Sequence, residues 1–127
     1  LNRLKKKHVF KLKKNNITIE SIPVKHGKIN SILYKIDKSC AYVSDVSKIY
    51  EKDYKKLKNL KYFIVDCLRY DPHPSHFNLD DVIKLVEIIK PKKTILTNMN
   101  NEIDYKKIQK FLPKNIVPGY DGMSLLI

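Results

Sequence analysis

Several side chains of this 127-residue sequence stand at the ends of strand-like segments or in the loops after them, and their types suit metal or acid–base chemistry. They are His26, Asp45, Asp66, His73, His76 and Asn98. Loops at strand ends are where layered sheets place their chemistry. A carboxylate such as Asp45 can bridge metal ions there, whereas the neutral amide of Asn98 at a matching strand end is a poor partner for it. The sequence therefore predicts a metal site from which ligands are missing.

Each of these side chains also has an ordinary structural explanation. His26 precedes Gly27 and can be a surface histidine, and Asp45 can simply begin a turn. His73 and His76 can belong to the entry of the following helix, although a histidine there can also act as a general acid. Asp66 can accept a hydrogen bond from a histidine and so orient its ring, without being a ligand itself. No single residue decides between these alternatives, so the functional hypothesis depends on their order and spacing together.

Apolar patterning predicts the elements that must position these residues. Strands are expected over residues 17–24, 31–36, 40–44, 62–65, 94–97 and 124–127. Helices are expected after Ser47, with an apolar face of Tyr50, Tyr54 and Leu57, and over residues 79–89 and 103–111. The helix over 79–89 is the clearest, because Asn78 is a good N-cap and Lys90-Pro91 ends it. Strands that alternate with helices predict an α/β layered domain, which some schemes would class as α+β.

Length and composition bound the class of protein. A chain of 127 residues can form one core but not two, so we expect a basic lead-in over residues 1–15 and one domain over 16–127. The first residue is Leu1 rather than Met, which predicts that other residues precede it. No apolar run approaches the roughly 20 residues of a membrane span, and no secretion signal is present. Cys40 and Cys67 lack metal-binding spacing, and we expect buried thiols and a cytoplasmic location.

The formal net charge of +13 raises the alternative of a basic, non-catalytic module that binds nucleic acid. Only Arg3 and Arg69 are arginines, however, and arginine is the residue that recognises phosphate and guanine through two parallel hydrogen bonds. Abundant Lys, Asn, Ile and Tyr with scarce Gly also indicate the codon bias of an AT-rich genome. Nucleic acid is therefore a possible partner but not the favoured one.

Taken in order, the site residues and their neighbours resemble a known family. The segments that carry the resemblance are His26-Gly27, Ser44-Asp45-Val46-Ser47, Val65-Asp66-Cys67-Leu68-Arg69, Pro72-His73-Pro74-Ser75-His76-Phe77, Leu96-Thr97-Asn98-Met99 and Tyr120-Asp121-Gly122. Together they are similar to the C-terminal half of a metallo-β-lactamase-fold hydrolase, in the branch of the phosphoribosyl cyclic phosphodiesterases. The resemblance covers residues 17–127. It implies one half of an αβ/βα four-layer sandwich, a mixed sheet with helices on one face.

The resemblance also implies roles for individual residues. His26 matches a histidine ligand of one metal, and Asp45 matches the carboxylate that bridges two metals. His76 matches a catalytic histidine that protonates the leaving group or contacts the phosphate, with His73 as a substrate-binding neighbour. Asp66 would stand behind the site and orient a histidine. Members of the family hold two Zn²⁺ or Mn²⁺ ions that activate a water and bind the phosphoryl oxygens.

Two departures from the family pattern are large. The His-x-His-x-Asp-His motif that supplies most of the metal ligands does not occur in this sequence, and the last histidine ligand is replaced by Asn98. We therefore expect a phosphodiester-directed hydrolase fragment with a degenerate site, inactive as an isolated chain and binding no metal by itself. Its expected partner is a separately encoded N-terminal half or a second copy of the chain. The sequence does not distinguish a split enzyme from the remnant of a decayed gene.

Overall fold

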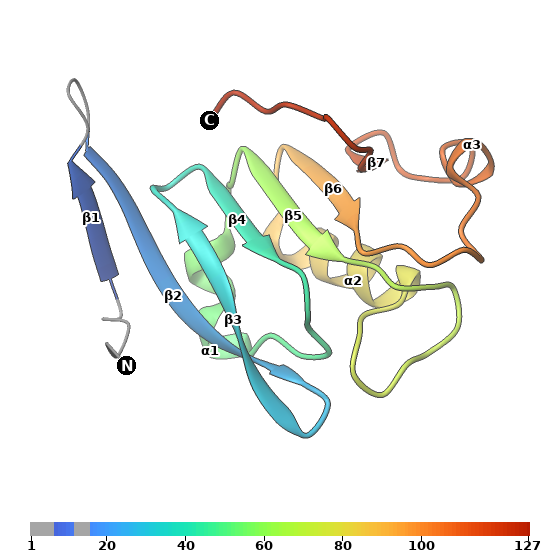
Figure 1. Cartoon of the computed structure of the whole chain (residues 1–127), viewed down its shortest axis with the longest axis horizontal. Helices are drawn as coiled ribbons and strands as arrows, with labels where there is room; N and C mark the ends of the chain where they lie inside the picture. The colour runs from blue at the N-terminus through green and yellow to red at the C-terminus, as the bar shows by residue number, and fades with distance from the viewer. Residues whose placement is uncertain (1–6, 12–15) are drawn as a thin grey trace.

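The structure is a computed structural model that describes residues 7–11 and 16–127, and these residues form a mixed seven-stranded sheet with helices on one face (Figure 1). The strands are β1 Lys7–Lys11, β2 Asn16–His26, β3 Ile29–Ile36, β4 Cys40–Val43, β5 Tyr62–Asp66, β6 Lys93–Thr97 and β7 Ile116–Pro118. The helices are α1 Glu51–Leu57, α2 Leu79–Ile89 and α3 Tyr105–Ile108. The expected α/β layering is confirmed.

Strand direction decides which residues meet at one edge of the sheet. The strands lie in sequence order, antiparallel from β1 to β4 and parallel from β4 to β7. Because β2 and β4 are both antiparallel to β3, the strands β2, β4, β5 and β6 all run in the same direction. Their carboxyl ends therefore lie along one edge, and these ends carry His26, the Ser44-Asp45 corner, Asp66 and Asn98.

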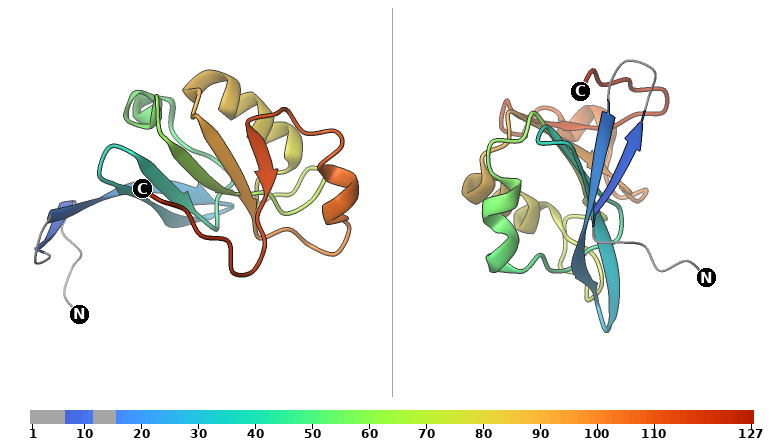
Figure 2. Two further views of the ribbon diagram at one scale, coloured as in Figure 1. Left: turned by 90° about the horizontal axis from the view of Figure 1, so that it is seen from above. Right: turned by 90° about the vertical axis from the view of Figure 1, so that its left-hand side faces the viewer.

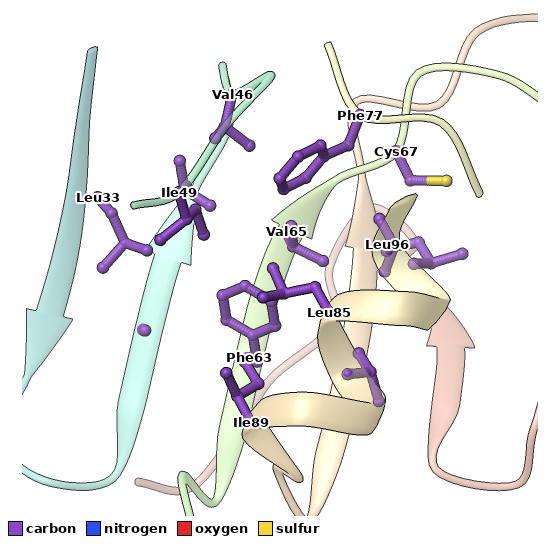
Figure 3. Packing of buried hydrophobic residues seen from close by; sticks show 14 of the residues in the cluster. Leu33, Val46, Ile49, Phe63, Val65, Cys67, Phe77, Leu85, Ile89 and Leu96 are labelled. Atoms are coloured by element: carbon purple, nitrogen blue, oxygen red, sulfur yellow. The ribbon is translucent and has the colours of Figure 1, made fainter. Parts of the chain in front are cut away.

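The hydrophobic core lies between the sheet and the helices α1 and α2, which cover the same face (Figures 2 and 3). Phe63 and Val65 of β5 are fully buried and pack in this core with Leu85 and Ile89 of α2. The alternation is strict, because Ile64 between them points to the opposite face and is only half-buried. In the described part of the chain, no helix is long and apolar enough to cross a membrane.

Helix α2 begins and ends as the sequence predicts. Asn78 accepts a hydrogen bond from the Asp81 backbone at 2.9 Å, and the Asp81 side chain accepts one from the Asn78 backbone at 3.3 Å, which completes a capping box. Lys90 closes the helix in a left-handed conformation with φ 50°, before Pro91. Both ends of the helix that follows His76 are therefore fixed by local interactions.

The structure differs from the expected elements at several places. Part of the lead-in, residues 7–11, forms strand β1, while residues 1–6 and 12–15 lie outside the described residues. The expected strand over 124–127 is wrong, because β7 at Ile116–Pro118 takes the edge beside β6 instead. The expected helix over 103–111 is limited to Tyr105–Ile108, and Phe111 is 81% exposed. The helix expected after Ser47 begins only at Glu51.

Both cysteines are buried and unpaired, as the sequence predicts. Burial raises the pKa of the Cys40 thiol. Burial, with smaller contributions from the negative charges of Asp66 and Asp81, raises the pKa of the Cys67 thiol to about 12. Burial and the raised pKa favour the protonated thiol at both positions, and a protonated thiol is a poor nucleophile.

The face of the sheet opposite α1 and α2 is apolar but only partly covered. The C-terminal segment after β7 runs across this face (Figure 2), and the Lys61 ammonium donates a hydrogen bond to the Leu126 carbonyl at 2.6 Å. A cavity of about 350 Å³ lies between this segment and Ile64 and Ile95 of the sheet. Farther along the same face, the paired residues Tyr34 and Tyr42 are 37% and 39% exposed.

Gly27 lies in the turn between β2 and β3, where the loop before α2 packs closely against it. Its φ is +58°, a backbone conformation that residues other than glycine rarely adopt. A Cβ atom at this position would lie 2.6 Å from the Ser75 hydroxyl oxygen and 3.3 Å from the Ser75 Cβ. The absence of a side chain at Gly27 thus lets the loop that carries His76 approach the end of β2.

We expect Gly27→Ala to destabilise the protein more than Gly122→Ala. Both glycines have positive φ, +58° and +87°, but the Gly122 Cβ would meet no atom within 4 Å. Each substitution should cost about 1–2 kcal/mol from the left-handed backbone, and Gly27→Ala about 1–3 kcal/mol more from overpacking against Ser75. Urea unfolding measures both values. The double variant Gly27→Ala/Ser75→Ala should recover part of the excess. Equal losses for the two single variants would contradict the close packing of the loop.

Candidate metal centre

Three ligand-type side chains from distant parts of the sequence converge at the carboxyl edge of the sheet. His26 ends β2, Asp45 follows β4, and His76 lies in the loop between β5 and α2. One ligand atom from each lies within 4.8 Å of the others, and all three residues are half-buried. The two histidines meet most closely, with their Nε2 atoms 3.1 Å apart and their ring centroids 4.6 Å apart. Within the described residues, no other group of three His, Cys, Asp or Glu side chains comes together in this way.

Asp66 stands directly behind this group and is fully buried. Its Oδ2 atom lies 2.6 Å from His76 Nδ1 and accepts a hydrogen bond from the Val46 backbone at 3.2 Å. Its Oδ1 atom accepts a hydrogen bond from the Asn98 amide at 3.0 Å. The carboxylate therefore joins four segments of the chain: the end of β5, the loop after β4, the end of β6 and the His76 loop.

The environment of Asp66 acts on its ionisation in two opposing ways. Burial raises the pKa of the Asp66 carboxyl, because removal from water disfavours the charged form. The hydrogen bonds from Asn98, Val46 and His76 lower the pKa of the same group and offset part of this effect. Since both oxygens already accept hydrogen bonds from N–H groups, the arrangement also makes His76 Nδ1 a donor. That assignment leaves His76 Nε2, the nitrogen facing His26, with its lone pair.

Asn98 faces the site as a hydrogen-bond donor. Its Nδ2 atom donates to Asp66 and, at 3.2 Å, to the Ser44 carbonyl. Because both partners can only accept, the orientation of the amide is fixed by the network. The residue also adopts a positive φ of 58°, which asparagine tolerates better than most side chains. Asn98 thus lies at the same edge as His26 and Asp45, as its strand-end position predicts.

The loop that carries His73 and His76 is held by hydrogen bonds along its length. The Phe77 N–H donates to the Val46 carbonyl at 2.7 Å, and the Leu68 N–H donates to the Phe77 carbonyl at 3.0 Å. Arg69 belongs to the same loop, and its guanidinium donates a hydrogen bond to the Pro72 carbonyl at 2.8 Å. These contacts fix His76 against the end of β2 without requiring a bound ligand.

His73 lies beside His76 but outside the group of three. Its ring centroid is 5.1 Å from that of His76, and its Nδ1 atom accepts a hydrogen bond from the Ser75 backbone at 3.2 Å. Desolvation and then the positive charge of Arg69 lower the pKa of the His73 imidazole. A neutral imidazole at the rim of the site can contact a substrate, which keeps the predicted role of His73 open.

The sequence did not identify two serines that support the site. The Ser44 hydroxyl donates to Asp45 Oδ2 at 2.8 Å, which orients that carboxylate. The Ser47 hydroxyl accepts a hydrogen bond from the Gly27 backbone at 2.9 Å, so Ser47 braces the turn after His26 instead of capping α1. The available signal was the short run Ser44-Asp45-Val46-Ser47, which places a hydroxyl on either side of the predicted ligand.

The donor set suits one divalent ion. Two imidazoles and one carboxylate are the ligands of many zinc sites that keep an open position. Two ions do not fit the described residues, because a single group of three ligands is too few for both.

Comparisons with known proteins identify the family and the fold of the chain. A family model described as a beta-lactamase superfamily domain matches residues 1–99. Among solved structures, a diphosphatase from the PhnP family superposes with a TM-score of 0.89 at 28% identity, and the match covers 99% of this chain and 48% of that chain. A comparison with proteins of curated function finds no match.

Two more distant structures share the fold. The metallo-β-lactamase fold protein YhfI from Bacillus subtilis has a TM-score of 0.67 at 14% identity, over 87% of this chain and 48% of that chain. The short form of human tRNase Z has a TM-score of 0.65 at 12% identity, over 96% of this chain and 48% of that chain. This chain therefore spans about half the length of these structures. Because the family model matches well over half of the sequence, the chain belongs to the β-lactamase superfamily and has the fold of its metal-dependent hydrolases.

Proposed function

We propose that this chain supplies one part of the active site of a metal-dependent, phosphodiester-directed hydrolase and does not catalyse hydrolysis by itself. The observation that carries the proposal is the convergence of His26, Asp45 and His76 at one edge of the sheet, with Asp66 behind them. The likeness to a PhnP-family diphosphatase supports a phosphate-containing substrate. In this proposal the site residues keep the roles that the family resemblance implies.

His26 and Asp45 would hold the metal, and Asn98 occupies the position of the missing last ligand. An ion bound there would supply positive charge to polarise a phosphoryl oxygen and to activate a water. His76 would contact the phosphate or protonate the leaving group, since Asp66 orients its ring and the His76 loop opens beside the ligand pair. His73 at the rim would contact the substrate.

The lack of activity follows from the incomplete ligand set. Phosphoryl transfer by two ions needs both the attacking and the leaving oxygen to be stabilised. The sequence contains four histidines and no His-x-His-x-Asp-His motif, so the other ligands would come from residues outside this sequence. The PhnP-family diphosphatase and YhfI are about twice as long as this chain, which is consistent with a missing part of similar size.

We expect the isolated chain to show no turnover of bis(p-nitrophenyl) phosphate with added Zn²⁺ or Mn²⁺. Addition of the half of the PhnP-family diphosphatase that has no counterpart here should give turnover that Asp45→Ala abolishes and Asp80→Ala preserves. Asp80 is an exposed residue of α2 and serves as the matched control. Asp45-dependent turnover by the isolated chain would refute the inactivity. A stable complex of the two halves without turnover would refute the hydrolase role.

The partly covered face of the sheet provides the surface on which such a partner would pack. On this face Tyr34 and Tyr42 are exposed and the neighbouring Ile64 is half-buried, whereas Ile95 is buried beside the cavity under the C-terminal segment. Exposed apolar side chains that gather on one face of a sheet mark an interface. In the absence of a complementary half, a second copy of the chain is the available partner.

We therefore expect the isolated chain to self-associate through this face. Light scattering should give a mass above the 15.0 kDa of a monomer. The double variant Tyr34→Lys/Tyr42→Lys should shift the mass toward the monomer, because lysines on one face repel across the interface. Ile88→Lys is the control, since Ile88 is 48% exposed on the helix side of the molecule. A monomeric wild type that melts cooperatively above about 60 °C would contradict the expectation.

A further inference from the structure

The sequence alone offered two metal ligands, His26 and Asp45, and two are too few to hold zinc in a protein. The structure adds a third nitrogen at the same point. His76 Nε2 faces His26 Nε2 at 3.1 Å, although 50 residues separate them in the sequence. We propose that, contrary to the expectation from the sequence, the isolated chain binds one Zn²⁺ ion through His26, Asp45 and His76, whereas in the complemented enzyme proposed above the added ligands would leave His76 to act on the substrate.

The hydrogen bonds of His76 leave the correct nitrogen available. Its Nδ1–H donates to the Asp66 carboxylate at 2.6 Å, so the neutral ring carries no proton on Nε2. A histidine ligand that donates its other N–H to a carboxylate is the arrangement found around protein-bound zinc, because the carboxylate fixes the ring and makes it more basic. His26 Nε2 then donates the hydrogen bond between the two rings in the metal-free protein. To bind an ion through Nε2, the neutral His26 ring would take the other tautomer, with its proton on Nδ1.

The distances between ligand atoms suit one ion. Nitrogen ligands about 2.0–2.1 Å from a tetrahedral zinc lie about 3.3–3.4 Å apart, close to the 3.1 Å between the two Nε2 atoms. One Asp45 carboxylate oxygen lies within 4.8 Å of a ring nitrogen of each histidine, and the Ser44 hydroxyl donates to Asp45 Oδ2. Asp45 is therefore within reach of an ion held between the two rings, which would have three protein ligands and a fourth position open.

Asn98 contributes to this site without binding the ion. Its amide donates to Asp66 Oδ1 and to the Ser44 carbonyl, so it fixes the carboxylate that orients His76. The Val46 N–H holds the other oxygen of the same carboxylate. Asn98 is thus a positioning residue for His76.

This inference shares His26 and Asp45 with the proposed function but does not depend on hydrolysis. It is tested by metal binding to the isolated chain, with Zn²⁺ measured by competition calorimetry and Co²⁺ by its visible absorption. We expect one Zn²⁺ per chain. His76→Ala and Asp45→Asn should each weaken binding more than about 100-fold, beyond the 10–100-fold loss typical of residues that only support a ligand.

Two further variants separate a ligand from a supporting residue. His73→Ala removes a neighbouring histidine of the same loop and should change Zn²⁺ affinity less than about 3-fold, since His73 lies outside the group of three. Asn98→Ala keeps all three ligands and should weaken binding about 10-fold. Circular dichroism checks that each variant is folded, and if His76→Ala is not, ¹⁵N spectra of the wild type show whether Zn²⁺ shifts the His76 Nε2 resonance.

The outcomes are distinct. Loss of binding in His26→Ala with full binding in His76→Ala would overturn the inference and leave His76 free for the substrate role proposed above. Absence of measurable Zn²⁺ binding by the wild type would also overturn it, without bearing on turnover in the complemented enzyme. An unshifted His76 Nε2 resonance at saturating Zn²⁺ would also overturn the inference that His76 binds the ion.

Discussion

The buried carboxylate of Asp66 is the interaction on which the geometry of the site depends. It has no exposed surface, and its two oxygens accept hydrogen bonds from Val46, His76 and Asn98. Each donor comes from a different segment, so the carboxylate holds the loop after β4, the His76 loop and the end of β6 against β5. A hydrogen bond to a charged group contributes about 1.5–3 kcal/mol, and a buried charge that loses a donor destabilises the fold. Site geometry and local stability are therefore coupled through one side chain.

Much of this arrangement follows from strand direction, which the sequence predicts only in part. Apolar runs identified β2 to β6, and the cap at Asn78 located α2 to the residue. Local patterns could not identify β7, because three residues ending in Pro118 carry too weak a signal. They also could not show that residues 124–127 leave the sheet and cross its other face, since an apolar segment packs equally well in a strand or against one. Tertiary contacts decide such segments.

The candidate site was predictable in its residues but not in its contacts. Asp45, Asp66 and Asn98 each follow an apolar strand, so their meeting at one edge was expected once parallel strands were assumed. The contact between His26 and His76 could not be predicted from strand direction alone. It depends on a turn at Gly27 without a side chain and on a loop closed by Arg69, and neither constraint has a sequence pattern that specifies distance. The types and spacing of these residues predict the kind of site, whereas the packing of the Gly27 turn against the His76 loop determines the distances between them.

Asn98 shows how one substitution can change a role instead of deleting it. Judged as a ligand, an amide in place of imidazole weakens a zinc site, because its carbonyl oxygen is a harder and less basic donor. Judged by its contacts, the same amide donates from one nitrogen to both Asp66 and Ser44. An imidazole nitrogen carries a single proton and could not satisfy both acceptors at once. A histidine at this position would therefore gain a possible bond to metal while releasing the carboxylate that orients His76. Metal binding at this edge is consequently a balance between the number of ligands and the order imposed on those that remain.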